Sequence, residues 1–259
     1  MSRLLANLRA SYTVVVVFLY VWIVGTPFVL HAWWTRRIGP LYRIGWWGAR
    51  LGLWLGGIRL EATGQENIPR GRACVFMANH LSNVDPPLLF VVLPPRIALI
   101  GKKQVFSIPV LGTALQLADF VPIDRQNPEA ARAAVEEALE RLQRGVSFLV
   151  FPEGTRSPDG RLQRFKHGVF VMALRAGAPI VPITLEGAEQ VMPKKKWEIY
   201  PGRVRVTIHP PVETTHRKMG ERSRLAREVQ AIIASALPPD KRPASLPAEA
   251  ATLSTDDSL

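Results

Sequence analysis

The chain has 259 residues, 47% of them hydrophobic, and a formal net charge of +12 at pH 7. This length fits one domain of ordinary size with additional segments. The single cysteine, Cys74, excludes an internal disulfide framework and suits a reducing compartment. The positive charge predicts anionic partners, which are lipid head groups, phosphorylated substrates or nucleic acid.

The N-terminal part of the chain is its most apolar part. Residues 12–34 contain no charged side chain and are long enough to cross a bilayer. Arg3 and Arg9 precede this run, as in a signal peptide, but the run is too long for one and no Ala-x-Ala-like cleavage site follows it. The sequence therefore predicts an uncleaved membrane anchor, which either spans the bilayer or enters and leaves on one side.

The segment that follows has an arginine at every seventh position. Arg36, Arg43 and Arg50 would lie along one stripe of a helix, and six of the seven tryptophans of the chain occur before residue 55. This combination predicts an amphipathic helix in the head-group region of a membrane. The alternative is a helix that packs its apolar face on the protein core, which five glycines would permit. These are Gly45, Gly48, Gly52, Gly56 and Gly57.

Basic residues flank the anchor on both sides and are more numerous after it. By the positive-inside rule, we expect the globular part on the cytoplasmic face of the membrane. The chain divides into a membrane segment (residues 1–58), a globular domain (59–237) and a C-terminal tail (238–259). The tail is rich in Pro, Ala, Ser and Asp, so we expect it to be disordered.

From about residue 60, strand-like and helix-like segments alternate, which is the pattern of an α/β domain. Asn127 is the expected cap of one helix, with Pro128 at its first position. The expected strands are residues 73–78, 96–101, 120–123, 147–151, 180–184 and 203–209. The expected helices are residues 86–93, 129–144, 165–176 and 221–236.

A turn at residues 79–87 follows a buried strand and precedes a helix. His80 is expected just past the carboxyl end of the strand, where open α/β sheets bind ligands. On a straight helix Asp85 would face away from His80, but a strand-to-helix turn can bring it back to the imidazole. A carboxylate bonded to one imidazole nitrogen fixes the tautomer and leaves the other nitrogen free to accept a proton. The alternative is structural, with Asp85 as a helix cap and His80 as an ordinary polar residue.

A second motif, Phe-Pro-Glu-Gly-Thr-Arg-Ser at residues 151–157, follows another buried strand. A histidine base beside several cations indicates a site for a phosphorylated alcohol, in which the cations hold the phosphate and the base faces the hydroxyl. Each cation alone fits a solvated surface residue better, but the shared position after strand ends favours a site. The residues expected beside His80 and Asp85 are Lys102, Arg125, Glu153, Gly154, Thr155 and Arg156.

Other chemistries fit the sequence less well. Residues 153–156 lack the Lys-Ser/Thr ending of a phosphate-binding loop, and the five histidines are scattered without metal-ligand spacing. Ser82 lacks the glycine-flanked elbow of serine hydrolases, and we interpret it as a turn residue that supports Asp85. Without an evident nucleophile, direct transfer between two bound substrates is favoured over a covalent intermediate. We expect neither a metal nor a cofactor.

These motifs resemble those of the membrane-bound glycerolipid acyltransferases, most closely the bacterial 1-acyl-sn-glycerol-3-phosphate acyltransferases. The His-x4-Asp block of that family is similar to His80–Asp85, and its third block is similar to residues 151–157. The second block has its counterpart within residues 101–125 and the fourth within residues 180–183. The resemblance covers residues 60–210 and implies a mixed, mostly parallel sheet flanked by helices. It departs from the family pattern at His167, where a lysine or arginine is expected.

The resemblance also implies the chemistry. His80 would deprotonate the sn-2 hydroxyl of a lysophosphatidate, with Asp85 orienting the imidazole. The acyl donor would be a thioester on coenzyme A or on acyl carrier protein, a co-substrate and not a cofactor. The expected partners are therefore a lysophospholipid, the acyl thioester, acyl carrier protein where it is the carrier, and the anionic membrane surface.

The remaining residues receive binding roles. Arg156, Lys102 and Arg125 would hold the phosphate of the acceptor. Glu153 would order its loop or contact the glycerol of the substrate, and Gly154 and Thr155 would supply close backbone approach and a hydrogen-bond donor.

Three alternatives stay open. Within the family, the acceptor could be glycerol 3-phosphate or another lysolipid, although the apolar N-terminal segment favours an acceptor that already carries a chain. From a different class, the protein could be a non-catalytic lipid-binding membrane protein, which the intact His80–Asp85 pair disfavours. Nucleic-acid binding would explain the charge but not the apolar residues 12–34.

Overall fold

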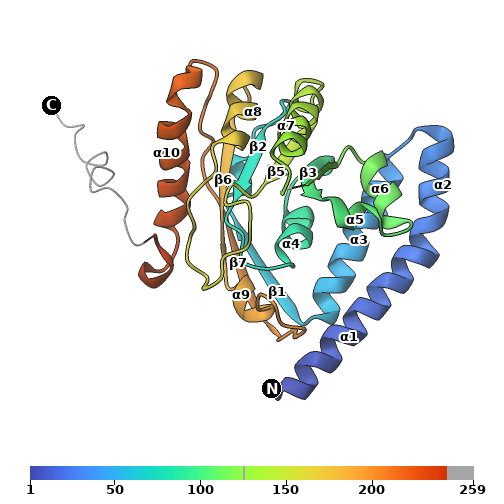
Figure 1. Cartoon of the computed structure of the whole chain (residues 1–259). Coiled ribbons are helices and arrows are strands. Elements are labelled where there is room, and N and C mark those ends of the chain that lie inside the picture. The colour runs from blue at the N-terminus through green and yellow to red at the C-terminus, as the bar shows by residue number, and fades with distance from the viewer. Residues whose placement is uncertain (125, 244–259) are drawn as a thin grey trace.

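The computed structural model describes residues 1–124 and 126–243 of the chain (Figure 1). In these residues, seven strands form one sheet with the order β1-β7-β6-β2-β5-β3-β4. All neighbouring strands are parallel except β6 and β7, which are antiparallel. The predicted α/β fold with a mixed, mostly parallel sheet is therefore confirmed. The strands are β1 (Ile58–Thr63), β2 (Val75–Ala78), β3 (Ile97–Lys102), β4 (Val121–Ile123), β5 (Ser147–Val150), β6 (Ile180–Glu186) and β7 (Gly202–Ile208).

Hydrophobic cores lie on both faces of the sheet, because successive side chains of a strand point to opposite faces. In the central strand β2, Val75 and Met77 belong to one core, and Phe76 and Ala78 to the other. The first core includes residues of α7 (Pro128–Gln143), α8 (Gly168–Ala176) and α10 (Arg222–Ser235). The second includes residues of α4 (Asp85–Val92) and α9 (Ala188–Val191). All four side chains of β2 are buried, so the apolar run that predicted a strand is explained by helices on both faces.

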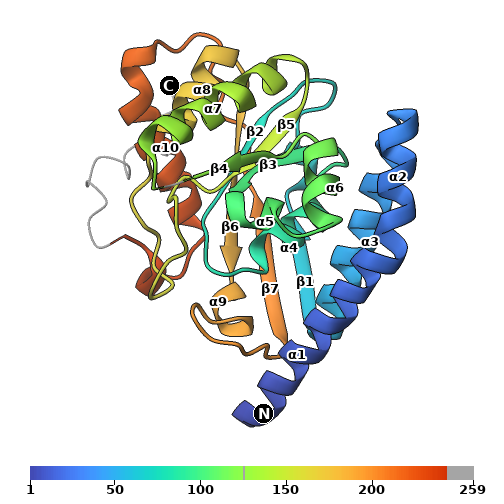
Figure 2. The same cartoon turned by 45° about the vertical axis from the view of Figure 1, so that its right-hand side comes forward.

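The N-terminal residues form one continuous helix beside the α/β domain (Figures 1 and 2). It consists of α1 (Arg3–Tyr20), a π-helical turn (Val21–Gly25) and α2 (Thr26–Thr35). These 33 residues are long and apolar enough to cross a membrane, and 17% of the most apolar window is buried inside the protein. Most of its apolar surface therefore faces outward. The exposed side chains include Leu4, Leu8, Tyr12, Val15, Leu19, Trp22, Ile23, Leu30 and Trp33, which we call the apolar stripe of α1–α2.

Helix α3 (Gly39–Leu55) packs against α1 through its glycines. A β-carbon at Gly48 would lie 2.7 Å from the ring of Tyr20, and one at Gly52 would lie 3.3 Å from Val17. The Tyr20 hydroxyl also donates to the carbonyl of Ile44, at 2.9 Å. One side of α3 thus packs on protein, which is the alternative that the glycines permitted.

The opposite side of α3 exposes alternating arginines and tryptophans, at Arg43, Trp47, Arg50 and Trp54. The predicted arginine stripe is present at two of its three positions. Arg36 does not belong to α3, because it ends α2 in the left-handed conformation, with φ 58°.

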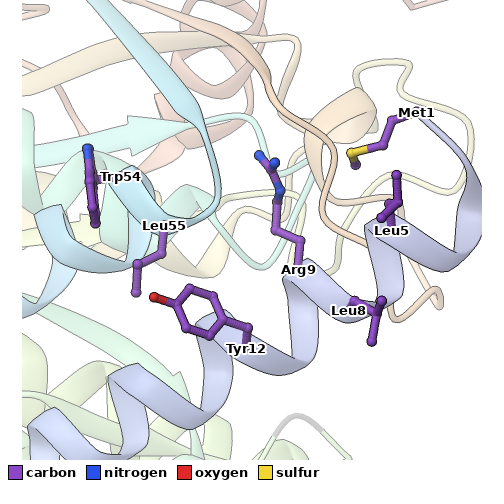
Figure 3. Close-up of a pocket in the computed structure, with 7 residues that line it drawn as sticks. All are labelled: Met1, Leu5, Leu8, Arg9, Tyr12, Trp54 and Leu55. Atoms are coloured by element: carbon purple, nitrogen blue, oxygen red, sulfur yellow. The ribbon is translucent and has the colours of Figure 1, made fainter.

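Between the first turns of α1 and the end of α3 lies an open groove of about 650 Å³ (Figure 3). Arg9 reaches from α1 towards the carbonyl of Gly56, at 3.4 Å, and the groove is otherwise mainly apolar. It is lined by Met1, Leu5, Leu8, Arg9, Tyr12, Trp54 and Leu55.

Several boundaries differ from those that the sequence predicted. Helix α8 begins at Gly168, three residues late, because the preceding loop has its own hydrogen bonds, among them that from the amide of Lys166 to the carbonyl of Pro152. In that loop the Ser157 hydroxyl donates to the carbonyl of Arg161, and the amide of Arg161 donates to Asp159. The short helices α5 (Lys103–Phe106), α6 (Leu111–Leu117) and α9 were not predicted.

The beginning of the predicted tail is ordered. Pro239–Lys241 form a 3₁₀ turn, and the carbonyl of Lys241 accepts a hydrogen bond from the amide of Leu162. Residues 244–259 lie outside the described residues.

Candidate active site

The turn after β2 holds His80 and Asp85 together. Asn79 fixes the end of the strand, because its side-chain amide exchanges two hydrogen bonds with the backbone of Leu185 in β6. Nδ1 of His80 then lies 2.7 Å from Oδ2 of Asp85, the first residue of α4. The contact that the spacing predicted is present. Among the described residues, Nε2 of His80 has no hydrogen-bond partner.

Asp85 is fully buried, and one of its carboxylate oxygens, Oδ2, has three hydrogen-bond partners. Oδ2 accepts the amide protons of Leu81 and Ser82, at 2.7 and 2.8 Å, in addition to its contact with His80. Oδ1 has no partner among the described residues. Two backbone donors therefore hold the carboxylate in place, so the imidazole is oriented by a fixed group. Because Nδ1–H donates to this carboxylate, the lone pair of the neutral ring is on Nε2.

The loop of the second motif is bound directly to the backbone of His80. The buried carboxylate of Glu153 accepts the amide proton of His80 at 2.6 Å and that of Gln163 at 3.1 Å. The amide of Ser157 donates to the carbonyl of His80 at 2.8 Å. Burial raises the pKa of Glu153 to about 8, against the opposing effect of these two amide donors. Of the two roles predicted for Glu153, the geometry favours ordering of the loop.

Phe151 completes the wall behind the imidazole. Its ring stacks on that of His80, with centroids 4.2 Å apart and planes inclined by 21°. The stacked ring limits rotation of the imidazole, which is an additional restraint beyond the bond to Asp85. The sequence did not assign Phe151 this role.

The predicted cations lie along the carboxyl edge of the sheet. Arg156 is half-buried, one residue before the Ser157 amide that binds His80. Lys102 is exposed at the end of β3, two strands from β2 and therefore roughly 10 Å away across the sheet. Thr155 is exposed on the same loop as Arg156. Arg125 lies outside the described residues.

Gly154 needs its glycine for a conformational reason, because its φ is +73°. The end of the Lys166 side chain lies beside it, within 3 Å of where a β-carbon would be. The Lys166 amide in turn donates to the carbonyl of Pro152 at 2.8 Å. Lys166 is thus part of the wall of the loop, next to His167, where the sequence departs from the family pattern.

Lys194 reaches the site from the connection between β6 and β7. Its ammonium donates to the carbonyl of Arg156. In the same connection, the carbonyl of Met192 accepts the Ser82 hydroxyl at 2.8 Å. Sequence reasoning missed Lys194, because the only signal was a run of three lysines at residues 194–196. Ser82 supports Asp85 through its backbone amide, as predicted, and its hydroxyl joins the His80 turn to this connection.

A mainly apolar cavity of about 340 Å³ adjoins the second motif. Phe151 lies between this cavity and the imidazole of His80, since it lines the cavity and its ring stacks on the imidazole. The cavity extends between the carboxyl ends of β3, β4 and β5 and helices α7 and α8. Its lining includes Ile100, Ile123, Val135, Val150, Gly154, Lys166 and Val169.

Cys74 takes no part in the site. It is buried before β2, and burial raises the pKa of its thiol to about 11, so the nucleophilic thiolate is disfavoured.

Comparisons with known proteins identify the family of the chain. The family profile "Acyltransferase" matches residues 59–186. A 1-acyl-sn-glycerol-3-phosphate acyltransferase of Limnanthes alba is 33% identical over 208 residues, which are 80% of this chain and 73% of that protein. A chloroplastic protein of the same name from Brassica napus is 39% identical over 156 residues, 60% of this chain and 45% of its own length. The chain thus spans about half the length of some of these relatives.

Bacterial relatives and a solved structure extend the comparison. A 1-acyl-sn-glycerol-3-phosphate acyltransferase of Pseudomonas aeruginosa is 36% identical over 166 residues, which cover 62% of this chain and 63% of that protein. The crystal structure of the 1-acyl-sn-glycerophosphate acyltransferase of Thermotoga maritima is similar with a TM-score of 0.75 and 28% identity. The match covers 89% of this chain and 92% of that one.

Proposed function

Because the chain belongs to the 1-acyl-sn-glycerol-3-phosphate acyltransferase family, we propose that it transfers a fatty acyl group from a thioester to the sn-2 hydroxyl of 1-acyl-glycerol-3-phosphate, giving phosphatidate. The observation that carries this proposal is the imidazole of His80, bound to Asp85 through Nδ1. Its other nitrogen has no hydrogen-bond partner among the described residues, so it can accept the proton of a hydroxyl.

The proposed reaction proceeds by direct transfer. Nε2 of His80 removes the proton of the sn-2 hydroxyl as the oxygen attacks the carbonyl carbon of the thioester. Asp85 stabilises the resulting imidazolium through its contact with Nδ1. The carbon–oxygen bond forms, the carbon–sulfur bond breaks, and the imidazolium gives its proton to the departing thiolate, which leaves as the free thiol. Base catalysis of this kind contributes about 10²–10⁴-fold, and positioning of the two substrates supplies the rest.

In this proposal the cations bind the acceptor. Arg156 holds the phosphate with Lys102, because a guanidinium and an ammonium both form charge-assisted hydrogen bonds with phosphate oxygens. Glu153 acts indirectly, by fixing the loop of Arg156 to the backbone of His80. The apolar cavity beside Phe151 has the lining that an acyl chain of a substrate requires.

We further propose that the protein binds a membrane through its N-terminal helices, with the α/β domain on the cytoplasmic face. The support is the outward-facing apolar stripe of α1–α2 and the arginines and tryptophans on the exposed side of α3. An acceptor that already carries one chain resides in the same membrane, which favours lysophosphatidate over glycerol 3-phosphate.

The test is release of thiol from acyl-coenzyme A in detergent, with lysophosphatidate, glycerol 3-phosphate or other lysolipids as acceptor. We expect release to depend on lysophosphatidate and to be abolished by His80→Ala. His216→Ala, at an exposed histidine, is the matched control and should be as active as wild type. Equal release by wild type and His80→Ala would refute the mechanism. Preference for another acceptor would refute the substrate assignment alone.

A non-catalytic lipid-binding protein is the alternative from a different class. It would bind lysophosphatidate equally well before and after His80→Ala and would release no thiol in either case.

A further inference from the structure

The connection between β6 and β7 carries a basic, aromatic tip. Its sequence is Pro-Lys-Lys-Lys-Trp at residues 193–197, and Trp197 is the one tryptophan of the chain outside the N-terminal helices. Lys195 and Lys196 are exposed, and Trp197 exposes 53% of its surface. Lys195 has φ +65°, in the left-handed region, so the backbone turns sharply at the tip.

The tip packs against the first turns of α1. The indole N–H of Trp197 donates to the hydroxyl of Ser11 at 3.0 Å, and the amide of Ile199 donates to the carbonyl of Ala6 at 3.2 Å. Glu198 forms an ion pair with Arg3 at 2.6 Å. The exposed face of Trp197 is therefore beside the apolar stripe of α1–α2.

The three consecutive lysines have different surroundings. Lys194 turns inward and binds the carbonyl of Arg156. Lys195 and Lys196 form no ion pair with an acidic side chain in the described residues. Lys195 and Lys196 thus carry charges without an ion-pair partner in the described residues, whereas Lys194, in the same connection, contacts the loop of Arg156.

We propose that Lys195, Lys196 and Trp197 bind the anionic head-group layer of the membrane, with the lysines on lipid phosphates and the indole at the interface. This inference rests on the proposed membrane association and adds a second contact, made by the α/β domain itself. Clustered lysines are attracted to anionic lipids, and tryptophan favours the interface between water and hydrocarbon.

An acidic protein, such as a carrier of the acyl donor, is the competing partner for two lysines. The structure favours the membrane for two reasons. Trp197 supplies an apolar body that a purely electrostatic contact does not use, and the tip continues the surface of α1, which is apolar. The contact would also fix the distance between the candidate active site and the membrane surface, because Lys194 and Met192 join the tip to the loops of Arg156 and Ser82.

The experiment measures partition of the full chain, diluted from detergent, onto vesicles. One set of vesicles is pure phosphatidylcholine, and the other contains phosphatidylglycerol. We expect wild type to prefer the anionic vesicles and the double variant Lys195→Gln/Lys196→Gln to lose roughly 30-fold in that preference, since each lysine near a membrane contributes about fivefold. Trp197→Ser should weaken binding to both kinds of vesicle.

The matched control is Arg224→Gln/Arg227→Gln, which removes the same charge from exposed positions of α10. An equal loss of preference in this control, or no loss in the lysine variant, would overturn the proposal. A lysine variant that binds vesicles normally but loses turnover only with acyl carrier protein as donor would assign the tip to that protein instead.

Turnover separates this inference from the proposed function. In detergent with acyl-coenzyme A, the lysine variant should release thiol as wild type does. If wild type itself releases no thiol but still prefers anionic vesicles through the tip, the acyltransferase proposal fails and the membrane contact stands.

Discussion

In the turn between β2 and α4, a single carboxylate oxygen of Asp85 has three neighbours, the Nδ1 of His80 and two backbone amides. The geometry of Asp85 is therefore maintained by the backbone, and its charge acts on the imidazole. Position and charge can be separated experimentally, because an amide has nearly the same shape as a carboxylate.

We expect Asp85→Asn to fold and to lose about 10²-fold or more in kcat, since a neutral amide cannot stabilise the imidazolium that forms during proton transfer. Steady-state thiol release and thermal unfolding together provide the measurement. Asp240→Asn, at an exposed position, is the control. An unchanged kcat in a folded variant would show that the charge of Asp85 is not used.

Glu153 makes stability depend on pH. Its pKa is raised to about 8 in the folded protein, so between about pH 4.5 and 8 the folded state binds a proton that the unfolded state has released. The free energy of unfolding therefore falls as pH rises through this window, by at most about 1.4 kcal/mol per pH unit.

The corresponding variant is Glu153→Gln, which cannot titrate. Thermal unfolding should show wild type losing stability relative to the variant as pH rises from 5 towards 8. The exposed Glu66→Gln should show no such trend. A difference between wild type and Glu153→Gln that is constant with pH would mean that Glu153 is already ionised at pH 5.

The sequence predicted the residue-scale contacts that are local and missed those that are distant. His80 and Asp85 are five positions apart on one turn, so the strand and the helix on either side bring them together. Lys194 is 38 positions from Arg156, and nothing in a run of three lysines distinguishes the one that turns inward. Phe151 was expected to be a strand residue, and its stacking on His80 depends on the pairing of β2 with β5.

At the scale of elements, glycines in α3 determine how closely α1 approaches. The sequence suggested two uses for this helix, in the head-group region and in packing, and the structure combines them on opposite sides. Its glycines face Tyr20 and Val17, whereas Arg43, Trp47 and Arg50 face outward.

We expect Gly48→Leu to destabilise the protein by about 1–3 kcal/mol, because its β-carbon would lie 2.7 Å from Tyr20 and the helices would have to separate. Gly39→Leu, in the same helix, should cost less, because apart from its chain neighbours no atom lies within 4 Å of a β-carbon there, and the remaining cost comes from Pro40, which follows it. Thermal unfolding in detergent measures both. Equal stabilities would show that α1 and α3 are not packed in this way.

Element types were more predictable than element ends. The apolar runs at β2, β5 and β6 identified buried strands, and Asn127 caps α7 as predicted, accepting the amides of Glu129 and Ala130. The start of α8 was missed because the amide of Lys166 donates to the carbonyl of Pro152 in the loop of the second motif, a distant contact that the sequence pattern does not show. Helix α9 has four residues, too few for a periodic pattern.

At the scale of the whole molecule, the net charge of +12 and the apolar stripe of α1–α2 predict two additive modes of membrane binding. Attraction between charges is screened by salt, whereas burial of apolar surface is not. We expect wild type to bind anionic vesicles less strongly at about 1 M salt than at low salt, yet to remain largely bound. Co-sedimentation with vesicles measures this, and complete release at high salt would contradict insertion of the apolar stripe.

Strand order has a consequence for biosynthesis. Strand β1, which directly follows the N-terminal helices, pairs in the described part of the chain with β7 alone, from the other end of the α/β domain. During translation the N-terminal helix leaves the ribosome long before its strand has a neighbour, so a bilayer can receive the helix while that edge of the sheet is still unformed. Under the proposed membrane binding, closure of the β1–β7 edge would be a late event on a chain whose N-terminal helix is already in the bilayer.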